Sequence, residues 1–161
     1  MRTAGHTLVE LLVVMAMLAL LAGIAVPALV HWRQALLVTA ASDPLLQAAH
    51  QARLIALTHG QPVRLCLADA QGRCLARALS ASDWAVWRDA PSPQLLRHQR
   101  LPAPLRVQAT RTASTWFGTP QAGTTATFTV CDGSGKARSR QVVISQTGRP
   151  RLQSLAGRGC G

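Results

Sequence analysis

The sequence predicts an α+β fold in which one long N-terminal helix packs against antiparallel β-sheet and a basic tail follows. Two observations support this prediction. Residues 11–30 contain no charged side chain, and a helical pattern of apolar residues continues beyond them. After Pro62 the apolar residues occur in short runs of period two, separated by clusters of Gly, Pro and Asp. A long helix followed by a series of such strands is typical of α+β proteins.

The first part of the helix is expected to span a membrane. At about 1.5 Å per residue, the uncharged run covers a hydrocarbon core of about 30 Å. The only plausible processing site, between Gly5 and His6, precedes this run, whereas a secretory signal is cut after its apolar stretch. We therefore expect a leader over residues 1–5, a membrane-spanning segment over 6–30, and a globular domain with the second half of the helix over 31–161.

The second half of the helix should run through Ala35 to about Thr58. Its apolar face is formed by Leu45, Ala49, Ala52 and Ala56. Proline lacks a backbone donor, so the helix either bends or restarts at Asp43-Pro44. A Gly-then-Pro pair, Gly60 and Pro62, ends it.

Period-two patterns predict five strands, at residues 63–67, 84–88, 106–109, 126–131 and 141–145. Trp84, Trp87 and Phe128 are expected in the core. The position of Trp116-Phe117 stays open, because this pair adjoins a Gly-rich loop.

The cysteine content fits an oxidising compartment. There are four cysteines, and neither they nor the five histidines show metal-ligand spacing, so we expect no metal. Four cysteines allow three pairings. Cys66 and Cys74 flank a short polar turn, which favours Cys66–Cys74 with Cys131–Cys160.

The N-terminal residues Gly5-His-Thr-Leu-Val-Glu10-Leu-Leu, with Pro27 further along, closely resemble the class III signal of type IV pilins and pseudopilins. His6 stands where most members have Phe. The resemblance implies that a prepilin peptidase cuts after Gly5 and that His6 is then N-methylated. It also implies that Glu10, a costly carboxylate in an apolar segment, meets the free amine of a neighbouring subunit in a filament. The expected location is the bacterial inner membrane, single-pass, with the C-terminal domain periplasmic, and a surface pilus after assembly.

The globular part resembles the FimT/GspH-type minor pilins. The matching stretches lie at residues 61–66, 83–87, 127–132 and 142–151, together with Cys74. Members of this group serve either type IV pili or the pseudopili of type II secretion.

The basic residues are concentrated late in the chain. Of seventeen bases sixteen are arginines, and ten bases against one acid lie between Pro91 and Gly161. These residues are on the translocated side, where the positive-inside tendency does not explain them. A sustained positive field of this kind is typical of proteins that bind a polyanion.

The most specific part of this region is Gly148-Arg149-Pro150-Arg151. Arginines two apart in an extended segment project to the same side, about 6 to 7 Å from one another, which is comparable to successive phosphates of a DNA strand. The tetrapeptide resembles the Gly-Arg-x-Arg motif of FimT-type pilins that bind DNA in natural transformation. The candidate DNA-binding residues are Lys136, Arg138, Arg140, Arg149, Arg151 and Arg158.

The sequence thus predicts a minor type IV pilin that binds double-stranded DNA. Because no base-reading element is visible, the contacts are expected to be with phosphates and independent of base sequence. The alternatives are a minor pseudopilin of type II secretion and a purely structural minor pilin whose arginines are solvated or face acidic neighbours. No nucleophile–base set or cofactor motif is present, and 132–136 lacks the spacing of a phosphate-binding loop, so we expect neither an enzyme nor a cofactor.

Overall fold

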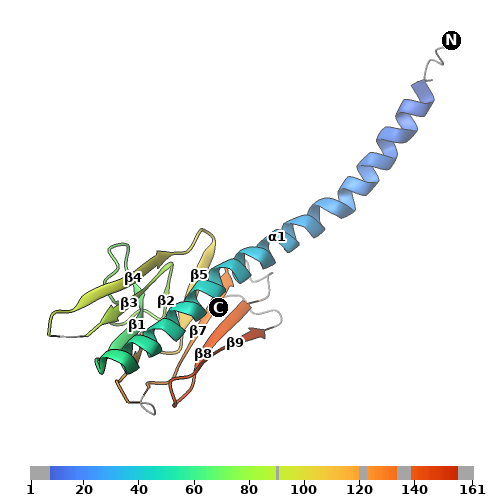
Figure 1. Cartoon of the computed structure of the whole chain (residues 1–161). Helices are drawn as coiled ribbons and strands as arrows, with labels where there is room; N and C mark the ends of the chain where they lie inside the picture. Colours follow the sequence, from blue (N-terminus) through green and yellow to red (C-terminus); the bar gives the residue numbers. More distant parts are fainter. Residues whose placement is uncertain (1–7, 90, 120–122, 134–138, 156–161) are drawn as a thin grey trace, which may run out of the picture.

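The computed structural model describes residues 8–89, 91–119, 123–133 and 139–155. One helix, α1 (Leu8–His59), is followed by nine strands. Figure 1 shows that the helix extends far beyond the strands at its N-terminal end and lies along them at its C-terminal end. The strands are β1 (Val63–Ala68), β2 (Ser80–Ala81), β3 (Asp83–Arg88), β4 (Gln94–Arg100), β5 (Leu105–Ala109), β6 (Ala113–Trp116), β7 (Ala126–Asp132), β8 (Ser139–Ile144) and β9 (Pro150–Leu155).

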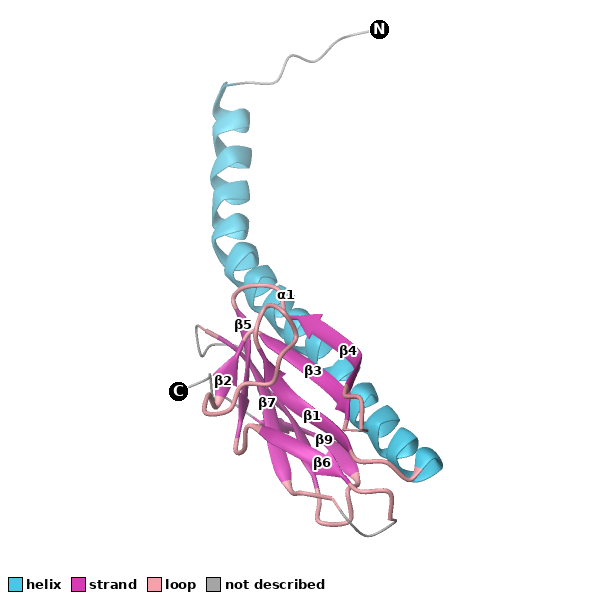
Figure 2. Ribbon diagram, turned by 90° about the vertical axis from the view of Figure 1, so that its left-hand side faces the viewer, coloured by secondary structure: helices cyan, strands magenta, loops and turns pink. Residues whose placement is uncertain are grey.

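The projecting half of α1 is apolar and is not buried by any of the described residues. Its most apolar window has a mean hydropathy of 2.6 and is 0% buried, so the helix is long and apolar enough to cross a membrane. The chain stays helical through both Pro27 and Pro44. Of the two possibilities left open at Asp43-Pro44, a restart is therefore wrong. The helix is curved, as Figure 2 shows, and prolines are a usual cause of helix bending.

The distal half of α1 presents a face of small residues to the strands. Ala49, Ala52 and Ala56 are fully buried together with Leu45, as the helical spacing predicted. Alanine side chains let the helix axis approach the sheets closely, and the adjoining strands supply the large side chains. The helix contacts strands of both sheets and closes one side of the core.

The strands form two antiparallel sheets. Sheet A has the order β4-β3-β1-β6, and sheet B has the order β2-β5-β7-β8-β9. All five expected strands are present. The sequence did not predict β2, β4, β6 and β9 as strands. The segment around Arg149 and Arg151, which was expected to be extended, continues as the edge strand β9 and pairs with β8.

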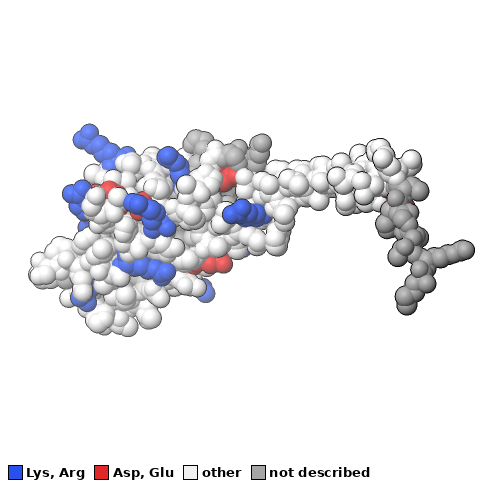
Figure 3. Space-filling view, turned by 90° about the horizontal axis from the view of Figure 1, so that it is seen from above, with Lys and Arg blue, Asp and Glu red and all other residues white. Residues whose placement is uncertain are grey.

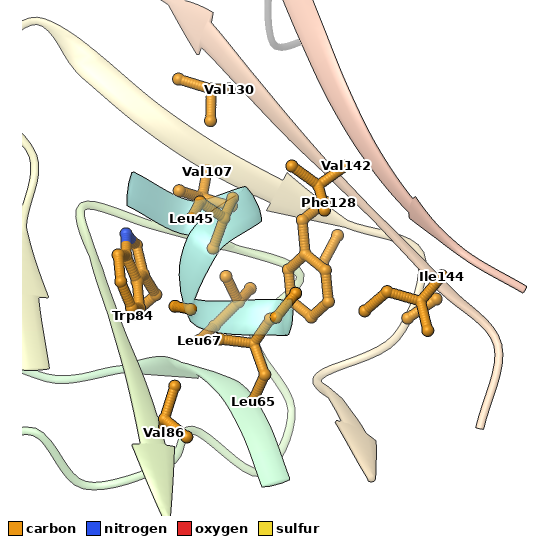
Figure 4. Close-up of a cluster of buried hydrophobic side chains, with 14 of the residues drawn as sticks. Leu45, Leu65, Leu67, Trp84, Val86, Val107, Phe128, Val130, Val142 and Ile144 are labelled. Carbon is orange, nitrogen blue, oxygen red and sulfur yellow. The ribbon is translucent and has the colours of Figure 1, made fainter. Parts of the chain in front are cut away.

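Large apolar residues from both sheets fill the space under the helix. In Figure 4 the side chains of Trp84, Phe128, Val142 and Ile144 lie around Leu45 of α1. Trp84 and Phe128 are fully buried, as expected. Trp87 is only half-buried, since it lies against the disulfide at the far face of sheet A.

A disulfide joins Cys66 of β1 to Cys74, with a Cα–Cα distance of 5.6 Å, and this is the first of the favoured pairings. The turn between them is held by the Asp69 carboxylate, which accepts backbone N–H groups of Gln71 and Arg73 at 2.9 Å each. Trp87 donates its indole N–H to the carbonyl oxygen of Gly72 at 2.9 Å, which fixes this turn against β3. Cys131 is disulfide-bonded as well. Its expected partner, Cys160, lies outside the described residues.

Candidate nucleic-acid interface

The Gly-Arg-Pro-Arg sequence covers the end of a tight connection between β8 and β9, residues 145–149, and the first two residues of β9. We refer to residues 145–151 as the arginine turn. The backbone N–H of Gly148 donates to the carbonyl oxygen of Ser145 at 2.8 Å, and that of Ser145 donates to the carbonyl oxygen of Arg149 at 3.2 Å. Gly148 has a φ of 68°, in the left-handed region that favours glycine. Gly148 therefore lies in a turn that leads directly into a paired strand.

Trp116 of β6 anchors this turn to the other sheet. Its side chain is 2% exposed, and its indole N–H donates to the carbonyl oxygen of Gly148 at 2.8 Å. A Cβ atom at position 148 would lie 2.7 Å from Cδ1 of Trp116, which is closer than real contacts allow. The sequence left the environment of Trp116 open. The structure shows it buried and in contact with the arginine turn, whereas Phe117 is 43% exposed.

Arg149 and Arg151 lie on the solvent side of the arginine turn. Pro150, between them, pairs with Ile144 and is buried, so alternation places both arginines on the opposite side. Both are exposed, and both line one surface depression of about 350 Å³ together with Ser145 and Pro150. This arrangement agrees with the expectation that the side chains of Arg149 and Arg151 project to the same side of the segment.

Among the described residues, no acid forms a salt bridge with Arg149 or Arg151. Several other arginines of the described ranges do pair with a carboxylate. Arg73 contacts Asp69 at 2.8 Å and Arg100 contacts Asp83 at 3.0 Å, while Arg64 forms a close ion pair with Asp89. Figure 3 shows arginine side chains spread over the globular part on the face in view, with most of the projecting helix free of them. Arg149 and Arg151 therefore differ from Arg64, Arg73 and Arg100 in having no described acid as a salt-bridge partner.

Arg140 lies apart from the two arginines of the turn. Its guanidinium pairs with Asp43 of α1 at 3.0 Å, and its side chain is only 25% exposed. On β8 it faces the helix, on the opposite side of the sheet from Val143, which pairs with Arg151. Its observed contact is therefore a link between the helix and sheet B. The structure does not bring Arg140 together with Arg149 and Arg151.

The other predicted site residues lie mostly beyond the described ranges. Lys136, Arg138 and Arg158 are outside the described residues, and so are Gly5 and His6 of the expected processing site. Glu10 lies near the start of α1, within its exposed apolar part.

The sequence missed one residue next to the arginine turn. Arg111 follows β5, is exposed, and lines a second depression of about 300 Å³ that also includes Ser145. Because Ser145 borders both depressions, Arg111 and the arginine turn belong to one continuous surface. No signal in the sequence indicates this, since 34 positions separate the two residues Arg111 and Ser145 in the chain. Only the pairing of β5, β7 and β8 brings them together.

Comparison with known proteins defines the class of this molecule. A long apolar helix packed on two antiparallel sheets is the fold of the type IV minor pilin FimU of Pseudomonas aeruginosa, with a TM-score of 0.53 and 18% sequence identity over 71% of this chain and 91% of that one. A second crystal form of FimU gives a TM-score of 0.54 and 18% sequence identity, over 72% of this chain and 87% of the FimU chain. The minor pseudopilin EpsH of the Vibrio cholerae type 2 secretion system gives a TM-score of 0.57 and 11% sequence identity. That match covers 73% of this chain and 96% of EpsH.

The family model described as type II transport protein GspH matches residues 41–148, and the prokaryotic N-terminal methylation motif matches residues 1–26. The chain belongs to the GspH family of minor pilins and pseudopilins. A comparison with curated proteins gives no match.

Proposed function

We propose that this chain is a minor type IV pilin that binds double-stranded DNA through the phosphates, and that a separate retraction motor then draws the DNA inward. The observation that supports the proposal is the arginine turn: two exposed arginines border one depression, and no described acid pairs with either. Guanidinium groups bind phosphate oxygens with two parallel donors, which gives the contact direction as well as charge.

The rigidity of the turn also favours this role. Paired strands on one side and the Trp116 hydrogen bond on the other hold the backbone between the arginines before any ligand arrives. A backbone that is already ordered loses less entropy on binding. A disulfide between Cys131 and Cys160 would further restrain the chain beyond β9, and we retain that pairing as part of the proposal.

The N-terminal part of the proposal concerns assembly. The methylation motif supports cleavage by a prepilin peptidase between Gly5 and His6 and insertion of α1 into a filament of other pilins, with Glu10 facing a neighbouring amine. The globular domain would then be periplasmic until the pilus reaches the cell surface. An intact mass that begins at any residue other than His6 contradicts this cleavage.

The central experiment measures DNA affinity of the detergent-solubilised full chain at about 0.05 to 0.2 M salt, with two duplexes of unrelated sequence. We expect similar affinity for both duplexes. Each single change, Arg149→Gln or Arg151→Gln, should lower the log–log salt slope by about one unit. Lysine at either position should give intermediate binding, since it keeps the charge and loses the two-donor fork.

The second candidate is a minor pseudopilin of type II secretion, which the GspH match and the fold of EpsH favour. In that role the arginines would contact acidic sister subunits. Weak binding of the parent chain to both duplexes at physiological salt, or genes for a secretion system beside this one, would favour the pseudopilin over the DNA-binding pilin.

A further inference from the structure

A second depression continues the surface of the arginine turn across the end of sheet B. It is lined by the loop after β5, the start of β7 and the end of β8, and its volume is about 300 Å³. The residues that border it are Thr110, Arg111, Thr125, Ala126, Thr127, Val143, Ile144 and Ser145. No carboxylate is among the described residues that border this depression or the one beside Arg149 and Arg151.

Strand pairing sets the length of the combined surface. The backbones of Thr110 and Thr127 are hydrogen-bonded at 3.0 Å, Thr127 is opposite Val143, and Val143 is opposite Arg151. Neighbouring strands lie about 4.8 Å apart, so three such steps separate Thr110 from Arg151 by about 14 Å. Arg111 adjoins Thr110. One end of this row therefore carries the Arg111 guanidinium beside the hydroxyl groups of Thr110 and Thr127, and the other end carries Arg151, with Val143 between them.

The Arg111 end of the row can also donate hydrogen bonds to an anion. The Oγ1 atom of Thr110 accepts the backbone N–H of Thr127 at 3.0 Å, which leaves its hydroxyl hydrogen for another acceptor. Arg111 is exposed, and no described acid forms a salt bridge with it. Positive groups at both ends, hydroxyl groups next to Arg111 and no carboxylate among the described bordering residues match a chain of phosphates better than a single compact anion.

We infer that Arg111, with the hydroxyl groups of Thr110 and Thr127, forms a second phosphate-binding subsite for the DNA strand that the arginine turn holds. The inference rests on the proposed DNA-binding function and extends it. Since successive phosphates of one strand lie about 6 to 7 Å apart, about 14 Å corresponds to about two phosphate steps along the strand. The bound strand then crosses the end of sheet B from β9 toward the loop after β5.

The test compares three variants of the full chain in detergent by DNA affinity and salt slope: Arg111→Gln, the double change Arg149→Gln/Arg151→Gln, and all three together. Arg33→Gln is the matched control, because Arg33 is an exposed arginine on α1 outside both depressions. We expect Arg111→Gln to weaken binding about fivefold to tenfold at 0.1 M salt and to lower the salt slope by about one unit. The triple variant should lower the slope by about three units, and Arg33→Gln should leave it unchanged.

The outcomes separate this inference from the function on which it rests. If Arg111→Gln binds like the parent while the double variant loses affinity, the inference is overturned and the DNA-binding arginine turn stands. In that case a role for Arg111 in contacting an acidic neighbouring subunit can be followed by its incorporation into filaments. If neither variant differs from the parent, both the inference and the proposed site are wrong. Equal losses in Arg111→Gln and Arg33→Gln also overturn the inference, because net charge then explains both.

Discussion

Two depressions on this molecule have nearly the same volume and two arginines each, yet they differ in charge balance. One, of about 340 Å³, lies beside the disulfide and is bordered by Arg64 and Arg73. The other, of about 350 Å³, lies at the arginine turn and is bordered by Arg149 and Arg151. Asp89 borders the first depression and pairs with Arg64, and Asp69 pairs with Arg73. No described acid pairs with the arginines of the second. The two depressions therefore carry the same number of arginines, and only those of the second have no described acid as a salt-bridge partner, which is where we propose that the polyanion binds.

The largest expected difference between the two regions is in stability. Replacing Cys66 and Cys74 by serine opens a short loop, which should lower the free energy of unfolding by about 2.5 kcal/mol in the loop-entropy estimate. DNA affinity should stay unchanged, because the disulfide lies in sheet A beside the acid-paired arginines. Thermal unfolding and DNA binding of the same sample check this.

Non-reducing peptide mapping of the parent accompanies that measurement. It should show Cys66–Cys74 and the proposed Cys131–Cys160. A parallel loss of stability and DNA affinity in the serine variant would mean that the two regions are not independent.

The next effect concerns the geometry of the arginine turn. Gly148→Ala keeps every charge, but a residue with a Cβ atom in the left-handed region costs about 1–2 kcal/mol, and this Cβ would also displace Trp116. We expect lower stability together with weaker DNA binding.

Gly23→Ala on the projecting helix is the control for the same change, since a Cβ there meets nothing within 4 Å. Full DNA affinity in a folded Gly148→Ala protein would show that the position of the arginines does not matter.

The smallest effect concerns the acid-paired region. The backbone N–H of Arg73, its guanidinium and the backbone N–H of Gln71 hold the pKa of Asp69 below its ordinary value of 3.8. Since the folded-state pKa is lowered, the ionised carboxylate stabilises the turn at pH values above 3.8, and this contribution is lost as the pH falls through the lowered pKa. Arg73→Gln should raise the pKa of Asp69 only in part, because the backbone N–H at position 73 remains. An NMR pH titration of the carboxyl group tests this, and a pKa unchanged by the substitution would contradict it.

Much of the fold could be predicted from the sequence, because its signals are local. The uncharged run, the small-residue face around Ala49 and Ala52, and the period-two strands each depend on neighbouring residues. The strand β4 was missed because its residues are polar and its pairing with β3 shifts register between Val86 and Trp87. The strand β9 begins with a proline and lies at a sheet edge, where proline is tolerated.

The candidate site was predictable only where its residues are adjacent. Arg149 and Arg151 share a side because they are two apart in an extended segment. The partner of Arg140, by contrast, is Asp43, 97 positions earlier, and no local pattern indicates that ion pair. Trp116 and Arg111 reach the arginine turn through the register of the two sheets, which the sequence alone does not provide.

The most direct test of the central claim uses the two depressions as matched controls. Arg149→Gln/Arg151→Gln and Arg64→Gln/Arg73→Gln each remove two positive charges from a chain of net charge +11. Salt-dependent DNA binding of the two folded double variants is then compared. We predict that the first loses about two units of salt slope and about 25- to 100-fold in affinity at 0.1 M salt, while the second differs from the parent less than about twofold. Equal losses in both variants, or unchanged binding in the first, would contradict the claim that the unpaired arginines form the binding site.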